Sequence, residues 1–240
     1  MSTNGPLQLQ FVTSGARLSD LPATPGEVAI VGRSNVGKSS LINALANRTQ
    51  LAKVSKTPGR TQLLNLFALP DGRTVMDLPG YGFAAAPGSV RAGWSAMIEG
   101  YLLGRHNLRA VIVLVDAEVG PTKRDVEALE WLRAENLPIK IVATKLDKVK
   151  PSRRGTRQSE LATGCGLGVG DIEWVSAAKN MNVDGLRRKI LEWAGSSGQE
   201  SRSRNARSKP KRSKPSTGPR DQSKFPDNGP RVDTDDGWDD

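Results

Sequence analysis

The stretch VGRSNVGKSSLINAL, residues 31–45, decides the fold of this chain. An apolar run precedes it, and apolar residues at helical spacing follow it. Gly32, Gly37, Lys38 and Ser39 match the pattern G-x-x-x-x-G-K-S/T without a mismatch. Glycines let such a backbone wrap so that successive N–H groups point at phosphate oxygens, and the N-terminus of the following helix adds its dipole. The stretch therefore predicts a phosphate-binding loop between a strand and a helix.

The side chains of this loop predict a nucleotide with a bound metal. We expect Lys38 to bridge the β and γ phosphates, and the Ser39 hydroxyl to bind Mg²⁺. A glycine-rich turn with a chance lysine is the alternative, which the strand-to-helix context disfavours. The predicted nucleotide-binding residues here are Gly32, Arg33, Ser34, Asn35, Val36, Gly37, Lys38 and Ser39.

Strand and helix patterns alternate along most of the chain. The turn sequence PDG joins the second and third apolar runs and predicts an antiparallel hairpin. We predict an α/β fold with a mostly parallel six-stranded sheet, one antiparallel strand and helices on both faces, with ligands at the carboxyl ends of the strands. The expected strands are 27–32, 61–69, 73–79, 110–117, 138–146 and 172–177, and the expected helices lie near 38–48, 88–104, 122–136, 151–163 and 183–194.

Charge is distributed unevenly over the 240 residues, whose formal net charge is +10. Residues 201–220 hold eight basic and no acidic side chains, and residues 221–240 hold two basic and seven acidic ones. These segments are almost without aliphatic residues and cannot bury enough apolar surface to offset their ordering entropy. We predict an N-terminal segment, 1–26, that packs on a nucleotide-binding domain of 27–195, and a disordered tail, basic then acidic, at 196–240.

Neither a secreted nor a membrane-spanning protein is indicated. The first residues have neither a basic start nor an apolar core, and the longest apolar run is the six residues AVIVLV, 110–115. The lone cysteine, Cys165, cannot form an internal disulfide, and with the single His106 it makes no metal site. We expect a cytoplasmic protein, and the positive charge suggests a polyanion as partner.

The segment ATKLDK, 143–148, predicts which base the nucleotide carries. Asp147 can accept hydrogen bonds from N1–H and the exocyclic amino group of guanine, whereas adenine would leave the carboxylate unpaired. The stem of Lys145 can lie along the base, and the backbone of Ser176, Ala177 and Ala178 can donate to guanine O6. The string is a weak signal alone and a strong one behind a phosphate loop, so it favours GTP over ATP. The predicted base-binding residues are Thr144, Lys145, Leu146, Asp147, Val175, Ser176 and Ala177.

Two further segments predict contacts to Mg²⁺ and to the γ-phosphate. In DLPGYG, 77–82, Asp77 is expected to hold Mg²⁺ through a water and the Gly80 N–H to sense the γ-phosphate. In SKTPGRTQ, 55–62, Thr57 and Thr61 compete for the metal, and we choose Thr61, because it begins a predicted strand. The predicted nucleotide-binding residues of these segments are Gly59, Arg60, Thr61, Gln62, Leu63, Asp77, Leu78, Pro79 and Gly80.

Together these motifs resemble the EngB family of bacterial ribosome-assembly GTPases, also called YihA or YsxC, in the Era-like and TrmE-like group. The resemblance covers roughly residues 8–195 and rests on GRSNVGKSSLIN, SKTPGRTQLLNLF, DLPGYGFA, ATKLDK and VSAAK. It implies a P-loop NTPase fold of the Ras-like G-domain type, GTP hydrolysis, a role in large-subunit assembly and normal septation, and the large-subunit precursor or its rRNA as partner. It also leads us to expect a monomer that binds no DNA. Thr144 stands where most GTPases have asparagine, and the family commonly has threonine there.

The same comparison suggests how hydrolysis is assisted. Ras-like enzymes orient the attacking water with a glutamine after D-x-x-G, and here Tyr81 takes that position, so intrinsic hydrolysis should be slow. In related GTPases an asparagine in the phosphate loop ligates K⁺, and we hypothesise that Asn35 does so here; the alternative is that its side chain only braces the loop. The predicted catalytic residues are Lys38, Asn35, Thr61 and Gly80.

A second hypothesis gives the charged tail the leading part. Eight cations over twenty residues can bind RNA phosphates, although a solvated spacer is the usual role of a charge run. The chain would then be a nucleotide-gated rRNA-binding protein in which hydrolysis is incidental.

Overall fold

The computed structural model describes residues 5–52, 63–81 and 88–196, with the backbone alone for 88–95. The predicted tail falls almost entirely outside these ranges. Within them no helix is long and apolar enough to cross a membrane.

Strands and helices alternate as the sequence predicts, and their bounds shift by a few residues. The helix expected near 151–163 is a short 3-10 turn followed by an α-helix that begins at Arg154. The strands are β1 (Gln10–Gly15), β2 (Glu27–Gly32), β3 (Leu64–Ala68), β4 (Thr74–Asp77), β5 (Leu108–Asp116), β6 (Ile139–Thr144) and β7 (Ile172–Trp174), and the α-helices are α1 (Lys38–Ala46), α2 (Gly88–Gly104), α3 (Lys123–Ala134), α4 (Arg154–Gly164) and α5 (Val183–Gly195).

The strands form one sheet in the order β1-β3-β4-β2-β5-β6-β7. β2 pairs in parallel with β4 and β5, and β5–β6 and β6–β7 are parallel as well. β3 is antiparallel to both of its neighbours, β1 and β4, so in the described part of the chain it is the one strand that runs against the others. Gly72, at φ +82°, donates its N–H to Leu69 O at 3.0 Å and closes the predicted hairpin between β3 and β4.

The sheet has seven strands where the sequence predicted six, because β1 was not foreseen. Its residues do not alternate: Phe11 and Val12 are adjacent and both exposed, at 55% and 45%, and only Gly15 of the strand is buried. The register also shifts between Phe11 and Thr13. An edge strand with this pattern lacks the period-2 signal on which sequence-based prediction depends. β1 nevertheless extends the sheet from within the N-terminal segment, and Leu7 and Leu9 just before it are buried.

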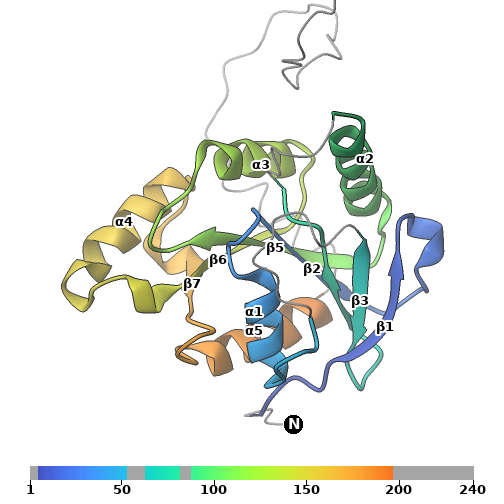
Figure 1. The fold of residues 1–240 in the computed structure, drawn as a ribbon, viewed down its shortest axis with the longest axis horizontal. Coiled ribbons are helices and arrows are strands. Elements are labelled where there is room, and N and C mark those ends of the chain that lie inside the picture. The colour runs from blue at the N-terminus through green and yellow to red at the C-terminus, as the bar shows by residue number, and fades with distance from the viewer. Residues whose placement is uncertain (1–4, 53–62, 82–87, 197–240) are drawn as a thin grey trace, which may run out of the picture. The chain divides into compact units, whose positions relative to one another are not determined.

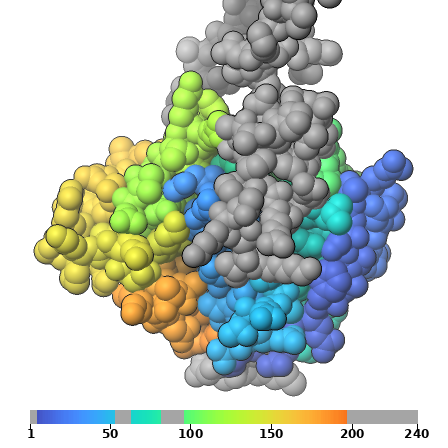
Figure 2. Space-filling view, in the orientation of Figure 1, coloured from blue at the N-terminus to red at the C-terminus, as the bar shows by residue number. Residues whose placement is uncertain are grey.

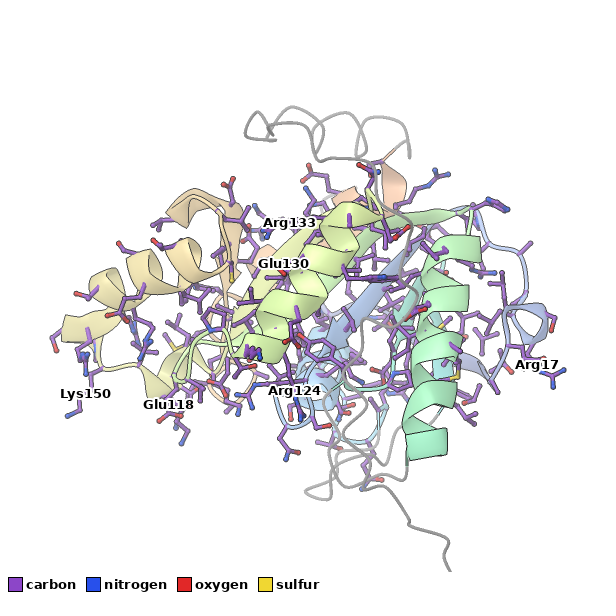
Figure 3. The ribbon with its side chains drawn as sticks, turned by 90° about the horizontal axis from the view of Figure 1, so that it is seen from above. Arg17, Glu118, Arg124, Glu130, Arg133 and Lys150 are labelled. Carbon is purple, nitrogen blue, oxygen red and sulfur yellow. The ribbon has the colours of Figure 1, made fainter. Side chains whose placement is uncertain are left out.

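Helices cover both faces of the sheet (Figure 1). α2, α3 and α4 pack on one face, where their buried residues join Ala29 and Val31 of β2 in one core cluster. α1 and α5 pack on the other face against Val28 and Ile30 of the same strand. Seen from above, α2 and α3 lie side by side over the sheet, and Arg124, Glu130 and Arg133 mark the length of α3 (Figure 3). In the space-filling view, residues of β1 and of the α4 region form opposite sides of the molecule (Figure 2).

A buried ionic cluster fixes α2 to the start of β2. The Glu27 carboxylate is fully buried and accepts hydrogen bonds from Tyr101 Oη at 2.5 Å, Arg105 Nε at 2.9 Å and Thr74 Oγ1 at 2.7 Å. Burial and the adjacent carboxylate raise the pKa of Tyr101, so its hydroxyl remains a donor. A buried charge needs such partners, because leaving it unpaired costs several kcal/mol. This cluster lies at the amino end of β2, whereas the phosphate-binding motif follows the carboxyl end.

Candidate nucleotide-binding site

The phosphate-loop motif lies between β2 and α1, as predicted. β2 ends at Gly32, and α1 begins at Lys38. Gly37 has φ +103°, a conformation that favours glycine. A Cβ on Gly32 would lie 2.9 Å from Val36 Cγ1, so only glycine fits there without a shift. The loop therefore turns tightly from the sheet into the helix.

Several N–H groups of this loop are available to a ligand. The backbone N–H groups of Asn35, Gly37, Lys38 and Ser39 form no hydrogen bond with any residue that the structure describes. The N-terminus of α1 adds positive potential at the same place. Unpaired N–H groups at a helix N-terminus form an anion-binding site.

Hydrogen bonds from other strands hold the loop in place. The Thr144 hydroxyl, at the end of β6, donates to Val36 O at 2.6 Å. Ser34 N donates to Tyr81 O and Tyr81 N to Gly32 O, both at 3.2 Å, so the residues after β4 continue alongside the loop. The threonine thus secures the loop by its hydroxyl, which gives a physical reason for its place in TKLD.

Lys38 and Asp77 meet beneath the loop. The Lys38 ammonium donates to Asp77 Oδ1, and both side chains are buried. Burial raises the pKa of the Asp77 carboxyl above its usual value, while the Lys38 ammonium and a hydrogen bond from Asn65 oppose that shift. Asn65 in turn accepts a hydrogen bond from Ser14 Oγ of β1 at 2.6 Å. A bound phosphate would give Lys38 a second anion to pair with, and a hydrated metal ion would give Asp77 a second cation.

The donor set fits Mg²⁺ bound together with a nucleotide. Ser39, at the start of α1, and Asp77, at the end of β4, offer the oxygen ligands that Mg²⁺ prefers. The described residues contain no group of three or more acidic, histidine or cysteine side chains that could hold a metal ion alone. Mg²⁺ in such sites keeps waters and takes the rest of its oxygens from phosphates.

The residues predicted to bind the base come together beside the loop. Asp147 Oδ1 accepts a hydrogen bond from Ser176 Oγ at 2.5 Å, which fixes the carboxylate's orientation. The Leu146 N–H donates to Val175 O at 3.1 Å and joins the two segments. One detail differs from the expectation: the Ser176 N–H donates to Met181 O at 3.0 Å and is not available to guanine O6. The N–H groups of Ala177 and Ala178 form no hydrogen bond with described residues.

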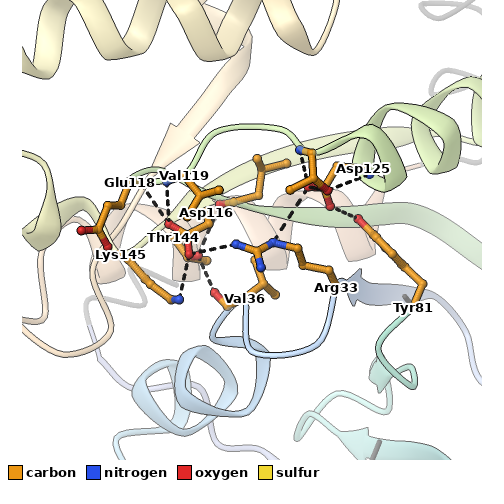
Figure 4. A network of polar contacts seen from close by, with 11 residues as sticks. Arg33, Val36, Tyr81, Asp116, Glu118, Val119, Asp125, Thr144 and Lys145 are labelled. Atoms are coloured by element: carbon orange, nitrogen blue, oxygen red, sulfur yellow. Dashed lines mark hydrogen bonds and ion pairs between the residues drawn. The ribbon is translucent and has the colours of Figure 1, made fainter. Parts of the chain in front are cut away.

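Two buried aspartates that the sequence analysis missed connect these motifs (Figure 4). Asp116, at the end of β5, pairs with Lys145 Nζ at 2.8 Å and with Arg33 Nη2 at 3.2 Å. Asp125, in the first turn of α3, accepts a hydrogen bond from Tyr81 Oη at 2.7 Å and lies 4.0 Å from Arg33 Nε. Both aspartates had a signal: Asp116 ends an apolar strand, and Asp125 completes a T-x-x-D capping box with Thr122.

Several predicted residues lie outside the described part of the chain or at its margin. Leu63 is exposed and precedes β3. Leu78 is buried, and with Pro79 it leads from β4 to Gly80 beside the loop. The proposed metal ligand Thr61, its competitor Thr57, and their neighbours Gly59, Arg60 and Gln62 fall outside the described residues.

The fold and the site together define the class of protein. A phosphate loop after β2, an aspartate and a glycine after β4, and a T-K-L-D segment after β6 all lie at the carboxyl ends of one mostly parallel sheet. That arrangement is the P-loop GTPase: a protein that binds GTP and hydrolyses it.

Comparisons with known proteins specify the family. A family model described as "50S ribosome-binding GTPase" matches residues 27–145. The probable GTP-binding protein EngB of Geobacter sulfurreducens is 44% identical over 75% of this chain and 88% of its own length. Its counterpart in Pelotomaculum thermopropionicum is 41% identical over 79% of this chain and 97% of its own length. The chain belongs to the EngB family.

Solved structures agree with this fold. A probable EngB crystal structure superposes with a TM-score of 0.58 at 24% identity, covering 70% of this chain and 98% of the other. Era bound to MgGDPNP and nucleotides 1506–1542 of 16S ribosomal RNA gives 0.57 at 26% identity, covering 73% and 59%.

The Ser176–Asp147 hydrogen bond leads to a prediction about base selection. In Asp147→Asn the amide oxygen can keep the bond from Ser176, which turns the amide N–H₂ toward the base. The amide N–H₂ is a hydrogen-bond donor that would then face another donor, the exocyclic amino group of guanine. We therefore expect GTP affinity to fall by about tenfold or more. Xanthine carries a carbonyl at C2 and should be bound better by the variant than by the wild type. Titrations with fluorescent GTP and with fluorescent xanthosine triphosphate measure the two affinities.

Asp71→Asn is the matched control, because Asp71 lies in the exposed hairpin between β3 and β4 and pairs with Arg73 there. It should leave both affinities unchanged. An Asp147→Asn variant that keeps full GTP affinity would show that this carboxylate does not read the base.

Proposed function

We propose that this chain is a GTP-driven switch in the assembly of the large ribosomal subunit, acts in the cytoplasm and is needed for normal septation. The observation that carries the proposal is the convergence of phosphate-loop, metal and base-recognition residues at one edge of the sheet, in a member of the EngB family. The nucleotide would report its state through the residues after β4, which lie against the phosphate loop.

The site residues have distinct roles in this proposal. Lys38 neutralises the β and γ phosphates, while the N–H groups of Asn35, Gly37, Lys38 and Ser39 donate to the phosphate oxygens. Ser39 and Thr61 would ligate Mg²⁺, and Asp77 would hold it through a water. When bound, Mg²⁺ neutralises charge that develops on the phosphates. Gly80 donates its N–H to the γ-phosphate, and Lys145 and Asp147 hold guanine.

Hydrolysis needs help in this site because Tyr81 cannot supply it. Burial first, and then the neighbouring Asp125 carboxylate, raise the pKa of Tyr81 far above its usual value. Its phenol therefore stays protonated and donates to Asp125, so it cannot take a proton from the attacking water. The intrinsic rate is then slow, and a cation or the ribosomal particle must accelerate it.

Asn35 is placed to recruit such a cation. Its backbone has φ +65°, its side chain is exposed, and within the described residues that side chain forms no hydrogen bond. These features support the K⁺ hypothesis over the alternative that Asn35 braces the loop. An exposed amide oxygen beside the phosphates can contribute one ligand to a monovalent cation.

The K⁺ hypothesis predicts faster GTP turnover in KCl than in NaCl at equal ionic strength, by about tenfold or more, a size we expect for one cation replacing an arginine finger. In Asn35→Ala the difference between the two salts should disappear. Phosphate release assays measure both rates. Equal wild-type rates in the two salts would refute the role of Asn35.

Two observations support a ribosomal partner. The matching family model is described as a ribosome-binding GTPase, and a similar structure, Era, was solved with a segment of 16S ribosomal RNA. On this chain Lys148, Lys150 and Arg153 are exposed and form no ion pair with described residues. They follow the T-K-L-D segment directly, so their positive charge lies beside the proposed guanine site and suits RNA phosphates.

The alternative function assigns most of the RNA affinity to the tail, because residues 201–220 carry eight basic and no acidic side chains. Hydrolysis would then be incidental to a nucleotide-gated rRNA-binding protein. The two proposals differ in what removing the tail does.

Co-sedimentation with purified ribosomal subunits tests the proposed function. The protein should pellet with the large subunit in a non-hydrolysable GTP analogue, weakly with GDP or no nucleotide, and still at raised salt. A chain truncated after residue 195 should keep this dependence on the nucleotide. Binding that ignores the nucleotide and is lost with salt or with the tail would favour the alternative.

A further inference from the structure

The chain has two tyrosines, and each donates its hydroxyl to a buried carboxylate. Tyr101 serves the ionic cluster at the amino end of β2. Tyr81 directly follows the glycine proposed to sense the γ-phosphate, and its hydroxyl reaches Asp125 of α3, 44 residues away in sequence. The Tyr81–Asp125 bond therefore joins the segment that contains Gly80 to α3, a helix that contains none of the nucleotide-binding motifs.

Asp125 is a fixed anchor for this bond. Its side chain is fully buried, and Oδ2 accepts from Thr122 N at 2.8 Å and from Thr122 Oγ1 at 2.7 Å. These contacts belong to the capping box of α3, so the carboxylate cannot turn away without loss of the cap. The remaining oxygen, Oδ1, accepts from Tyr81.

The Tyr81 backbone transmits this anchoring to the phosphate loop. Tyr81 N donates to Gly32 O, and Tyr81 O accepts from Ser34 N. Gly80 is thereby held against the loop, where a Cβ on it would lie 3.2 Å from Ser34 N. The Gly80 N–H itself forms no hydrogen bond within the described chain, so it remains available to a ligand.

Arg33 closes the arrangement from the loop side. Its Nη2 bonds Asp116 at 3.2 Å, and its Nε is buried without a hydrogen-bond partner among the described residues, 4.0 Å from Asp125 Oδ2. The loop and the residue after Gly80 thus face the same carboxylate (Figure 4). The Asp125 carboxylate therefore contacts Tyr81 and lies close to Arg33 of the loop.

We propose that Tyr81 and Asp125 are positioning residues for γ-phosphate recognition: their hydrogen bond holds Gly80 where its N–H meets the third phosphate of GTP. The inference rests on the proposed function and deepens it, since the motifs assign the contact to Gly80 and nothing in them assigns its placement to α3. A preplaced N–H avoids the ordering cost on binding. GDP lacks the γ-phosphate and gains nothing from the placement.

Tyr81→Phe tests the proposal because it removes one hydroxyl and keeps the ring. The affinity for a non-hydrolysable GTP analogue should fall by about tenfold or more, the size expected for losing a hydrogen bond to a charged group. The affinity for GDP should change by less than twofold. Fluorescent-nucleotide titrations with Mg²⁺ give both constants. A merely structural role would weaken both nucleotides alike.

Tyr101→Phe is the matched control. It removes the same group from the same kind of bond, Tyr101 Oη to Glu27 Oε1 at 2.5 Å, at the other end of β2. It should lower the melting temperature and leave the ratio of the two affinities unchanged. A shift of that ratio in Tyr101→Phe equal to that in Tyr81→Phe would overturn the proposal.

A double-mutant cycle adds Asp125. Asp125→Ala and the Tyr81→Phe/Asp125→Ala double variant should lose no more preference for GTP over GDP than Tyr81→Phe does, because all three variants lack the same hydrogen bond. The effects of the two single substitutions are then not additive. Additive effects, or a gain in GTP affinity in Tyr81→Phe, would contradict the proposed bond or its direction. If the wild type binds neither guanine nucleotide, the proposed function itself fails, and that outcome is distinct from all of these.

Discussion

A phosphate-binding loop cannot be held by hydrogen bonds from its own backbone N–H groups, because these groups must stay unpaired for the ligand. Such a loop has to be held from outside, and the rest of this structure supplies the hold. Thr144 fixes Val36 from β6, and the backbone of Tyr81, in the segment that follows β4, bonds the loop at Gly32 and Ser34. The sheet brings these elements together because β2 lies between β4 and β5, with β6 next to β5.

Two buried carboxylates also connect the phosphate loop and the residues after β4 to other parts of the fold. Asp116 joins the phosphate loop to the base-recognition segment through Arg33 and Lys145, and Asp125 joins the residue after Gly80 to α3. Buried carboxylates are costly to leave unpaired, so each strongly restricts the arrangement of its partners. The network fixes the relative positions of β5, α3 and the segments that follow β2, β4 and β6. Movement of one motif therefore has to disturb a partner in another.

Much of this could be predicted from the sequence, for identifiable reasons. The phosphate loop and the T-K-L-D segment are local patterns whose chemistry follows from residue type and spacing. The buried strands β2 and β5 are apolar on both faces, and the hairpin carries its turn residues in order. β1 was missed because its pairing depends on β3, 51 residues away at Ser14 and Asn65, and on no periodicity of its own.

The partners of Tyr81 and of Thr144 were beyond sequence reasoning for a related reason. Asp125 is visible as a capping residue, but which side chain takes its second oxygen depends on how α3 lies over the sheet. The backbone of Ser176 shows the converse: its place in VSAAK suggested a free donor, and the local turn uses that N–H for Met181. Sequence motifs indicate which groups a site needs, and the packing decides which of them remain free.

Amide hydrogen–deuterium exchange shows whether the N–H groups of the phosphate loop are unpaired in the protein without nucleotide. We expect the amides of Asn35, Gly37, Lys38 and Ser39 to exchange freely in the protein alone and to become strongly protected with MgGDP, while amides inside α1 change little. Equal protection of the loop amides with and without MgGDP would contradict this expectation, because those N–H groups would then already be paired within the protein.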